Sequence, residues 1–216
     1  MDDEECWQVI TAERQRLADL LDDLPAGAWD TPSLCDGWRV RDVAAHLVLG
    51  ACPLSWPARL AWGLRAAGRF HKLNHDVAVH HAARPTARIA ADLRTHAASR
   101  RLPVPLLTNP RTTLLDVLVH AQDIAIPLGL THAMPTTAAR AAADTAWTMG
   151  WPYRARRRLR GVHLHATDIP YDLGTGPLLE GPIAAIVLLL TGRPAALGSL
   201  TGPGVDAIRP ARTRRP

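Results

Sequence analysis

Apolar residues recur at helical spacing through most of the chain. In residues 4–24 they lie three or four positions apart with charged residues between them, which is typical of an amphipathic helix. Pro25 ends this helix, and residues 25–37 have the composition of a loop. Residues 71–85 are polar, and we expect a loop or a helix end there. The same helical spacing predicts further helices over residues 39–49, 53–70, 84–100, 112–128 and 136–149.

The pattern changes in the last quarter of the chain. Residues 162–166 alternate between apolar and polar side chains, as a strand does. Residues 182–191 predict a buried helix, and residues 202–208 predict a short strand. The sequence therefore predicts a mainly α protein, with an up-down helical bundle over residues 1–152 and a small α/β appendage over residues 160–210.

The positive charge is confined to two short segments. The chain of 216 residues has a formal net charge of +5 and a single lysine, Lys72. Five arginines lie within residues 154–160 and four within residues 209–215, and without these nine the chain would be net acidic. A solvated linker and a frayed tail are the simpler interpretation, with a polyanion-binding patch as the alternative. Nucleic-acid binding is disfavoured, because the sequence has no zinc finger and no aromatic–basic platform.

The remaining bulk features favour a cytoplasmic protein. The longest apolar run, Ile183–Leu190, is too short to cross a bilayer. The acidic residues 1–5 lack the basic character of an export signal. The three cysteines, Cys6, Cys35 and Cys52, form no CxxC pair, which suits a reducing compartment. Frequent arginine and alanine agree with a high-GC, actinobacterial source.

Two predicted helices each carry a histidine within an apolar run. His46 lies in residues 41–48, and His120 lies in residues 115–123. Asp116 precedes His120 by one helical turn and lies on the same face. Two imidazoles and a carboxylate form the ligand set of a zinc-type site with one open position, although nickel, iron and manganese accept the same donors. For either histidine alone, a hydrogen-bonded core residue is the alternative.

Other polar residues near these helices have less defined roles. Asp123 can fix the tautomer of a ligating histidine. Helix geometry makes a direct bond to His120 awkward, so we expect Asp123 to serve His46 or a substrate, with a surface salt bridge as the alternative. A further group of histidines is expected on the surface rather than at a second metal site. Its members are His71, His75, His80 and His81.

Three stretches together carry a family resemblance. The first is residues 24–47, LPAGAWDTPSLCDGWRVRDVAAHL, and the second is the spacing of Asp116, His120 and Asp123. The third comprises residues 166–168, 174–177, 180–182 and 190–193. In this order they resemble the mycothiol-dependent maleylpyruvate isomerase family, whose members are DinB-like metal-binding helical bundles. One position departs from the family, because Asp116 stands where a glutamate is usual. The helix must then approach the metal more closely, or a water must bridge.

The resemblance implies cofactors and a reaction. It implies a divalent metal held by His46, Asp116 and His120, with zinc as the first candidate. It also implies mycothiol as the thiol cofactor. In the family, the mycothiol thiolate adds to a cis-enedione such as maleylpyruvate, the bond rotates, and the thiol leaves to give the trans product. Arg193 resembles an arginine that the C-terminal region places near the site, with a helix-ending cation as the alternative.

The expected function is therefore that of a metal-dependent, mycothiol-using isomerase or thiol transferase. Its expected partners are a small-molecule substrate and a low-molecular-weight thiol. The alternative is a DinB-like protein that binds metal without isomerase activity and acts in binding or detoxification. The shorter Asp116 slightly favours that alternative. The sequence assigns neither the substrate nor the oligomeric state.

Overall fold

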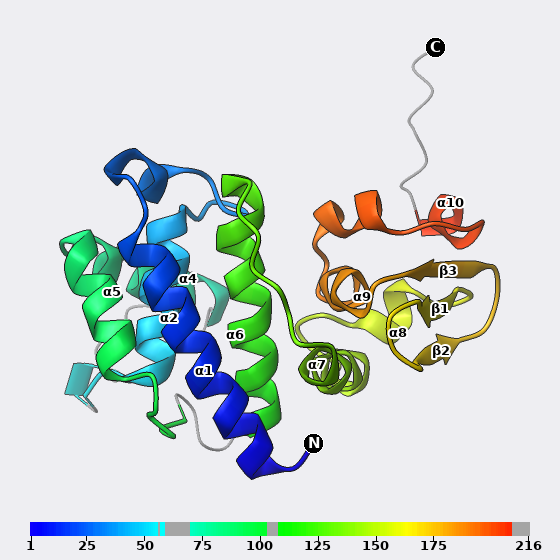
Figure 1. Ribbon diagram of the computed structural model, residues 1–216, viewed down its shortest axis with the longest axis horizontal. Helices are drawn as coiled ribbons and strands as arrows, with labels where there is room; N and C mark the ends of the chain where they lie inside the picture. Colours follow the sequence, from blue (N-terminus) through cyan, green and yellow to red (C-terminus); the bar gives the residue numbers. More distant parts are fainter. Residues whose placement is uncertain (56, 59–69, 103–107, 209–216) are drawn as a thin grey trace. The chain divides into compact units, whose positions relative to one another are not determined.

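The computed structural model describes residues 1–55, 57–58, 70–102 and 108–208. The chain divides into two compact units, Asp2–Ala133 and Met134–Pro216, with Met1 grouped with the second. The first unit is helical, and the second combines helices with a small sheet (Figure 1). No helix in the described ranges is both long and apolar enough to cross a membrane.

The first unit is a bundle built around three helices. They are α1 (Asp3–Asp22), α2 (Val40–Ala51) and α6 (Pro110–Ala125). The shorter elements η1 (Ala26–Asp30), α4 (Phe70–Ala82), α5 (Thr86–Thr95) and η2 (Ile126–Leu128) complete it. Helix α1 packs against α5 and α6, and α2 packs against α4, α5 and α6. The direct packing of α2 on α6 brings together the two helices that carry His46 and His120.

Local signals start these helices where the sequence suggests. Asp2 and Glu5 form a capping box at the start of α1, with bonds of 2.7 and 2.8 Å. Asn109 caps α6 and is followed by Pro110, whose missing N–H is not needed in the first turn. The Asp42 carboxylate accepts the backbone N–H of Arg39 at the start of α2, at 2.8 Å.

A buried polar network ties α1 to α6. His132 Nε2 lies 2.9 Å from Glu13 Oε1 of α1, and the Gln122 amide of α6 donates to the His132 carbonyl at 2.7 Å. Glu13 also pairs with Arg16 at 3.0 Å. Glu13, Gln122 and His132 are all buried, so breaking these bonds would leave unsatisfied polar groups in the core. The network therefore restrains the helix that carries Asp116 and His120.

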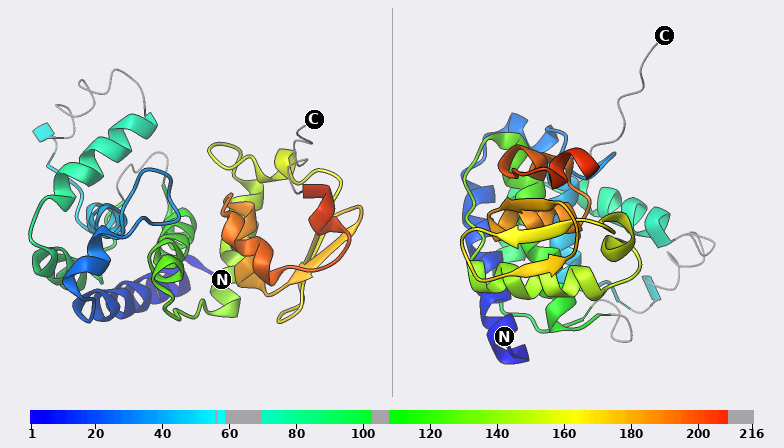
Figure 2. Two further views of the ribbon diagram at one scale, coloured as in Figure 1. Left: turned by 90° about the horizontal axis from the view of Figure 1, so that it is seen from above. Right: turned by 90° about the vertical axis from the view of Figure 1, so that its right-hand side faces the viewer.

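The second unit contains a three-stranded sheet. Strand β1 (His163–Ala166) is central, with β2 (Asp172–Gly174) antiparallel on one side and β3 (Leu178–Gly181) parallel on the other. Helix α9 (Ile183–Leu190) contacts β1 and packs against α7 (Thr136–Thr148), as Figure 2 shows. The remaining elements are α8 (Ala155–Arg158), η3 (Pro194–Ser199) and α10 (Gly204–Ile208).

The predicted fold class is confirmed, since the chain is mostly helical with a small C-terminal sheet. No strand precedes His163 in the described residues, although Pro32 and Arg39 form an isolated bridge. Helix α7, which the sequence suggested as the last helix of the bundle, groups with the second unit. The strand of residues 162–166 and the buried helix of residues 182–191 are present as β1 and α9.

Three segments differ from their prediction. Residues 71–85, expected as a loop or helix end, are mostly helical, as α4. Residues 202–208, expected as a strand, contain the short helix α10, and only Thr201 makes a bridge, to Glu180. The segment 154–160 is more than a solvated linker, because it contains α8. Its Arg158 guanidinium donates to the Leu189 and Leu190 carbonyls at 2.6 and 3.4 Å, at the end of α9.

Two other predictions cannot be compared with the structure over their full length. Most of the helix expected over residues 53–70 lies outside the described residues, although Pro53, Leu54 and Ser55 are not helical. The arginine-rich segment 209–215 also lies outside them.

Candidate metal centre

The structure brings the three predicted ligands together in the first unit. His46 projects from α2, and Asp116 and His120 project from α6. Asp116 Oδ1 lies 3.5 Å from His46 Nε2 and 3.3 Å from His120 Nε2. One ligand atom from each residue lies within 4.8 Å of the other two. The His46 and His120 rings meet edge to face, with centroids 4.9 Å apart.

These separations fit a metal better than they fit hydrogen bonds. Donors bound about 2.1 Å from a tetrahedral zinc ion lie about 3.4 Å from one another. The separations of 3.3 and 3.5 Å are close to that edge length. Good N–H···O bonds are shorter, about 2.7–3.2 Å. The shorter aspartate side chain thus reaches ligand spacing without a bridging water.

The carboxylate is the most exposed of the three groups. The Asp116 side chain is 37% exposed, whereas the His46 and His120 side chains are 17% and 13% exposed. The two imidazoles are therefore held within the protein while the carboxylate borders solvent. This arrangement suits three protein ligands and a fourth position open to an incoming molecule.

Asp123 bonds directly to His120, contrary to the expectation from helix geometry. Asp123 Oδ2 lies 2.8 Å from His120 Nδ1. Asp123 is fully buried, so the alternative of a surface salt bridge is also wrong. In the neutral ring with Nδ1–H donating to Asp123, the lone pair of His120 would be on Nε2, the atom that faces Asp116. This carboxylate–histidine arrangement orients a metal ligand and raises its basicity.

The loop before α2 supplies two further residues that sequence reasoning missed. The Cys35 thiol donates to Asp123 Oδ2 at 3.1 Å, and its sulfur lies 3.8 Å from His120 Nδ1. The Trp38 ring stacks on His120 with an interplanar angle of 4° and meets His46 edge to face. The Leu34 N–H donates to the Asp123 carbonyl at 3.2 Å, which holds the loop on α6. Both missed residues lie in the stretch 24–47 that carries the family resemblance, which is the one signal that marks them.

The charges in the cluster shift the pKa values of its members in opposite directions. Burial alone would raise the pKa of Asp116, but the charges of His120 and His46 hold it well below its usual value. Burial alone would lower the pKa of His120, but the negative charge of Asp116 and the hydrogen bonds of the ring to Asp116, Asp123 and Cys35 hold it well above its usual value. A cation is therefore favoured between these groups, either as a proton on His120 or as a metal ion.

The other histidines of the first unit lie elsewhere. His75 of α4 meets the Trp38 ring edge to face and lies 3.3 Å from Asp76. His81 lies 2.8 Å from the Arg84 guanidinium. Where side chains are described, none of the histidines at positions 75, 80 and 81 belongs to a group of residues spaced to hold a metal. The side chain of His71 lies outside the described part of the chain.

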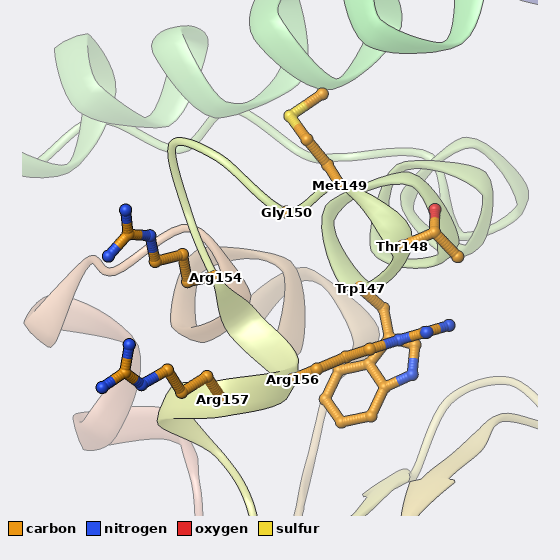
Figure 3. Close-up of a pocket in the computed structure, with 7 residues that line it drawn as sticks. All are labelled: Trp147, Thr148, Met149, Gly150, Arg154, Arg156 and Arg157. Atoms are coloured by element: carbon orange, nitrogen blue, oxygen red, sulfur yellow. The ribbon is translucent and has the colours of Figure 1, made fainter.

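The second unit contains Arg193 and a cavity lined by arginines. Arg193 follows α9, where its guanidinium donates to the Thr191 carbonyl at 2.8 Å. A cavity of about 190 Å³ lies near α8 (Figure 3). The Arg156 guanidinium covers the Trp147 ring at 5.8 Å from its centroid. The cavity lining comprises Trp147, Thr148, Met149, Gly150, Arg154, Arg156 and Arg157.

Comparisons with known proteins agree with the fold. The family model described as the mycothiol maleylpyruvate isomerase N-terminal domain matches residues 10–125, a range that includes His46, Asp116 and His120. A crystal structure of a mycothiol-dependent maleylpyruvate isomerase is similar, with a TM-score of 0.62, 15% identity, and coverage of 94% of this chain and 93% of that one. A histidine-to-alanine mutant of such an enzyme gives a TM-score of 0.63 at the same identity and coverage. No curated protein matches the sequence. The chain belongs to the mycothiol maleylpyruvate isomerase family, through its N-terminal domain.

Proposed function

We propose that this protein is a metal-dependent enzyme of the maleylpyruvate isomerase type that uses mycothiol as its thiol cofactor. Its reaction would be cis–trans isomerisation, or thiol transfer to a small electrophilic substrate. The observation that carries the proposal is the spacing of His46, Asp116 and His120. Asp116 Oδ1 lies 3.5 and 3.3 Å from the two imidazole nitrogens, close to the edge length of a tetrahedral metal site, and one ligand atom of each residue lies within 4.8 Å of the other two. Family membership gives this spacing its chemical context.

His46 Nε2, Asp116 Oδ1 and His120 Nε2 would hold the metal. Zinc is the first candidate, and nickel, iron and manganese accept the same donors. A metal with one open position would lower the pKa of a bound thiol and so supply a thiolate nucleophile at neutral pH.

The surrounding residues prepare the three ligands. Asp123 keeps the proton of His120 on Nδ1 and leaves Nε2 free to bind. The Cys35 thiol donates a hydrogen bond to the same Asp123 oxygen that contacts His120. The Trp38 ring lies parallel to the His120 ring, with centroids 6.5 Å apart, and lines this side of the cluster. Because these contacts restrain the ligand side chains, little ordering would be needed for a metal to bind.

Arg193 is proposed to act on the substrate. A guanidinium suits the carboxylates of a small dianion such as maleylpyruvate, because it can bind a carboxylate through two parallel hydrogen bonds. Its role is separable from metal binding. Arg193→Lys should weaken turnover while leaving the metal content unchanged, and equal losses in both would argue against this role.

The experiment that tests the proposed function has two steps. Metal analysis of protein purified without chelators should find a divalent ion that His46→Ala removes. Addition of mycothiol and maleylpyruvate should then give fumarylpyruvate, and omission of the thiol should stop the reaction. Metal binding with thiol binding but no turnover would support the alternative, a metal-binding protein that acts in binding or detoxification. Absence of a bound metal would overturn both functions.

A further inference from the structure

A second group of two histidines and one aspartate lies on the C-terminal sheet. His163 and His165 are two positions apart on β1, so they project from the same face. Leu164 and Ala166 between and beside them are buried on the opposite face. Asp172 of β2 reaches both histidines, with Oδ1 2.9 Å from His163 Nε2 and 3.0 Å from His165 Nδ1.

The register of the sheet adds a second carboxylate to this face. Asp172 is paired with His165 across the antiparallel ladder. Glu180 of β3 is paired with the same histidine on the other side, across the parallel ladder. Residues paired across a sheet share a face. Two imidazoles and two carboxylates therefore gather on the outer face of three adjacent strands, whose order is visible in Figure 1.

We propose that His163, His165 and Asp172 form a second metal site, distinct from the cluster in the first unit. Imidazole nitrogens with a carboxylate oxygen select a borderline divalent cation such as zinc, nickel or copper. Glu180 is placed to supply a fourth donor or to add negative charge beside the ion. This site does not depend on the proposed isomerase activity.

Metal binding at this site would require both imidazole rings to turn. Asp172 Oδ1 lies 2.9 and 3.0 Å from one nitrogen of each ring, but the ligand atoms of the three residues do not all lie within 4.8 Å of one another, as those of the first unit do. The side chains of His163, His165 and Asp172 are 36%, 40% and 58% exposed. Exposed rings can turn at little packing cost and bring both nitrogens to one ion. The energy needed to open the existing hydrogen bonds makes this site weaker than the cluster in the first unit.

The test is a titration of the metal-free, full-length protein with zinc chloride by calorimetry. Two equivalents should bind, one tightly and one more weakly. His163→Ala combined with His165→Ala should remove the weak equivalent and keep the tight one. His80→Ala combined with His96→Ala is the matched control, because it removes two histidines from outside either cluster, and it should retain both. A single equivalent in the native protein, unchanged in the His163/His165 variant, would overturn the proposal.

Two further variants separate this site from the first. His120→Ala should lose the tight equivalent and keep the weak one. The sheet site can therefore be tested even if the proposed enzyme function is wrong. In that variant nickel chloride should raise the thermal unfolding midpoint, and the added His163/His165 changes should abolish the rise. Asp172→Asn should weaken the remaining equivalent by at least several-fold. Unchanged zinc binding in this variant would show that Asp172 is not a ligand and would overturn the three-ligand assignment.

Discussion

The two histidine–aspartate clusters contain the same three groups but hold them differently. In the first unit the donor atoms are 3.3 and 3.5 Å apart, and both histidines are mostly buried. On the sheet the separations are 2.9 and 3.0 Å, and all three side chains are at least 36% exposed. The first spacing suits donors around an ion, and the second suits hydrogen bonds between the groups themselves.

Their surroundings explain this difference. His120 is bound to the buried Asp123 at 2.8 Å and is itself mostly buried, so it turns less easily to form a shorter bond with Asp116. His163 and His165 have more freedom to move onto Asp172 because they are more exposed. Residue composition alone therefore does not identify a strong metal site. Restraint of the donors by neighbouring groups decides how tightly the ion binds.

The largest expected effect is that of His120→Ala. This change removes one of the three ligands, and two protein ligands rarely hold zinc tightly. Metal retention in the first cluster and all thiol-dependent activity should be lost. Metal analysis after gel filtration measures this, with His80→Ala as the control. Retention of the tight equivalent would show that another residue takes the place of His120.

The change Asp123→Asn should have the next largest effect. Asparagine retains similar size but loses the charge that keeps the His120 proton on Nδ1, and loss of such an outer partner typically lowers metal affinity about 10–100-fold. Competition with a chromophoric chelator measures the affinity. An affinity equal to that of the native protein would mean that the 2.8 Å contact has no influence on the ligand.

Metal affinity should also rise with pH. The pKa of His120 is held well above its usual value, so in the metal-free protein this ring keeps its second proton to a higher pH than an ordinary imidazole does. The pKa of Asp116 is held well below its usual value, so its carboxylate is already ionised there. Binding must then release the proton of His120, and affinity should increase up to about tenfold per pH unit until the pH passes that raised pKa. A flat profile across neutral pH would show that His120 is neutral before binding.

Asp116→Glu should have a smaller effect that sharpens the comparison. The family usually has glutamate here, but the aspartate already lies at ligand spacing from both histidines. We therefore expect the extra methylene to crowd the site and lower affinity modestly. Higher affinity and higher activity in the glutamate variant would show instead that the native site is loose. No change in either would exclude Asp116 as a ligand.

The smallest effect is expected at Cys35. Cys35→Ala removes a weak hydrogen bond to Asp123 and should lower metal affinity only a few-fold, since sulfur is a weak donor. Cys35→Ser supplies a stronger donor and should retain native affinity and the native pH profile. A loss in both variants would show that the thiol contributes through packing rather than through its bond to Asp123.

Much of the fold follows from periodicity, and most errors arise where local pattern is weak. Helices α1, α2 and α6 have apolar residues at regular helical spacing, and their boundaries were close to those observed. The polar segment that forms α4 lacked such a stripe, yet packing against α2 stabilises it as a helix. Residues 202–208 were too short for periodicity to distinguish a strand from α10.

The ligands of the candidate site could be named from the sequence, but their supporting residues could not. His46, Asp116 and His120 have recognisable spacing within their helices. Cys35 and Trp38 reach the site from a loop, and nothing local to them indicates where the chain folds back onto α6. Asp123 was identified, but its partner was misassigned, because the His120 side chain adopts a conformation that reaches a residue only three positions away.

The central claim is that the first cluster holds a metal with one position open to a thiol. X-ray absorption of the zinc-loaded His163→Ala/His165→Ala protein tests it without interference from the sheet. We predict two imidazole nitrogens and light oxygen donors around the ion, with one of these donors replaced by sulfur at about 2.3 Å when mycothiol is added. Zinc without imidazole neighbours, or without sulfur at saturating mycothiol, would contradict the account.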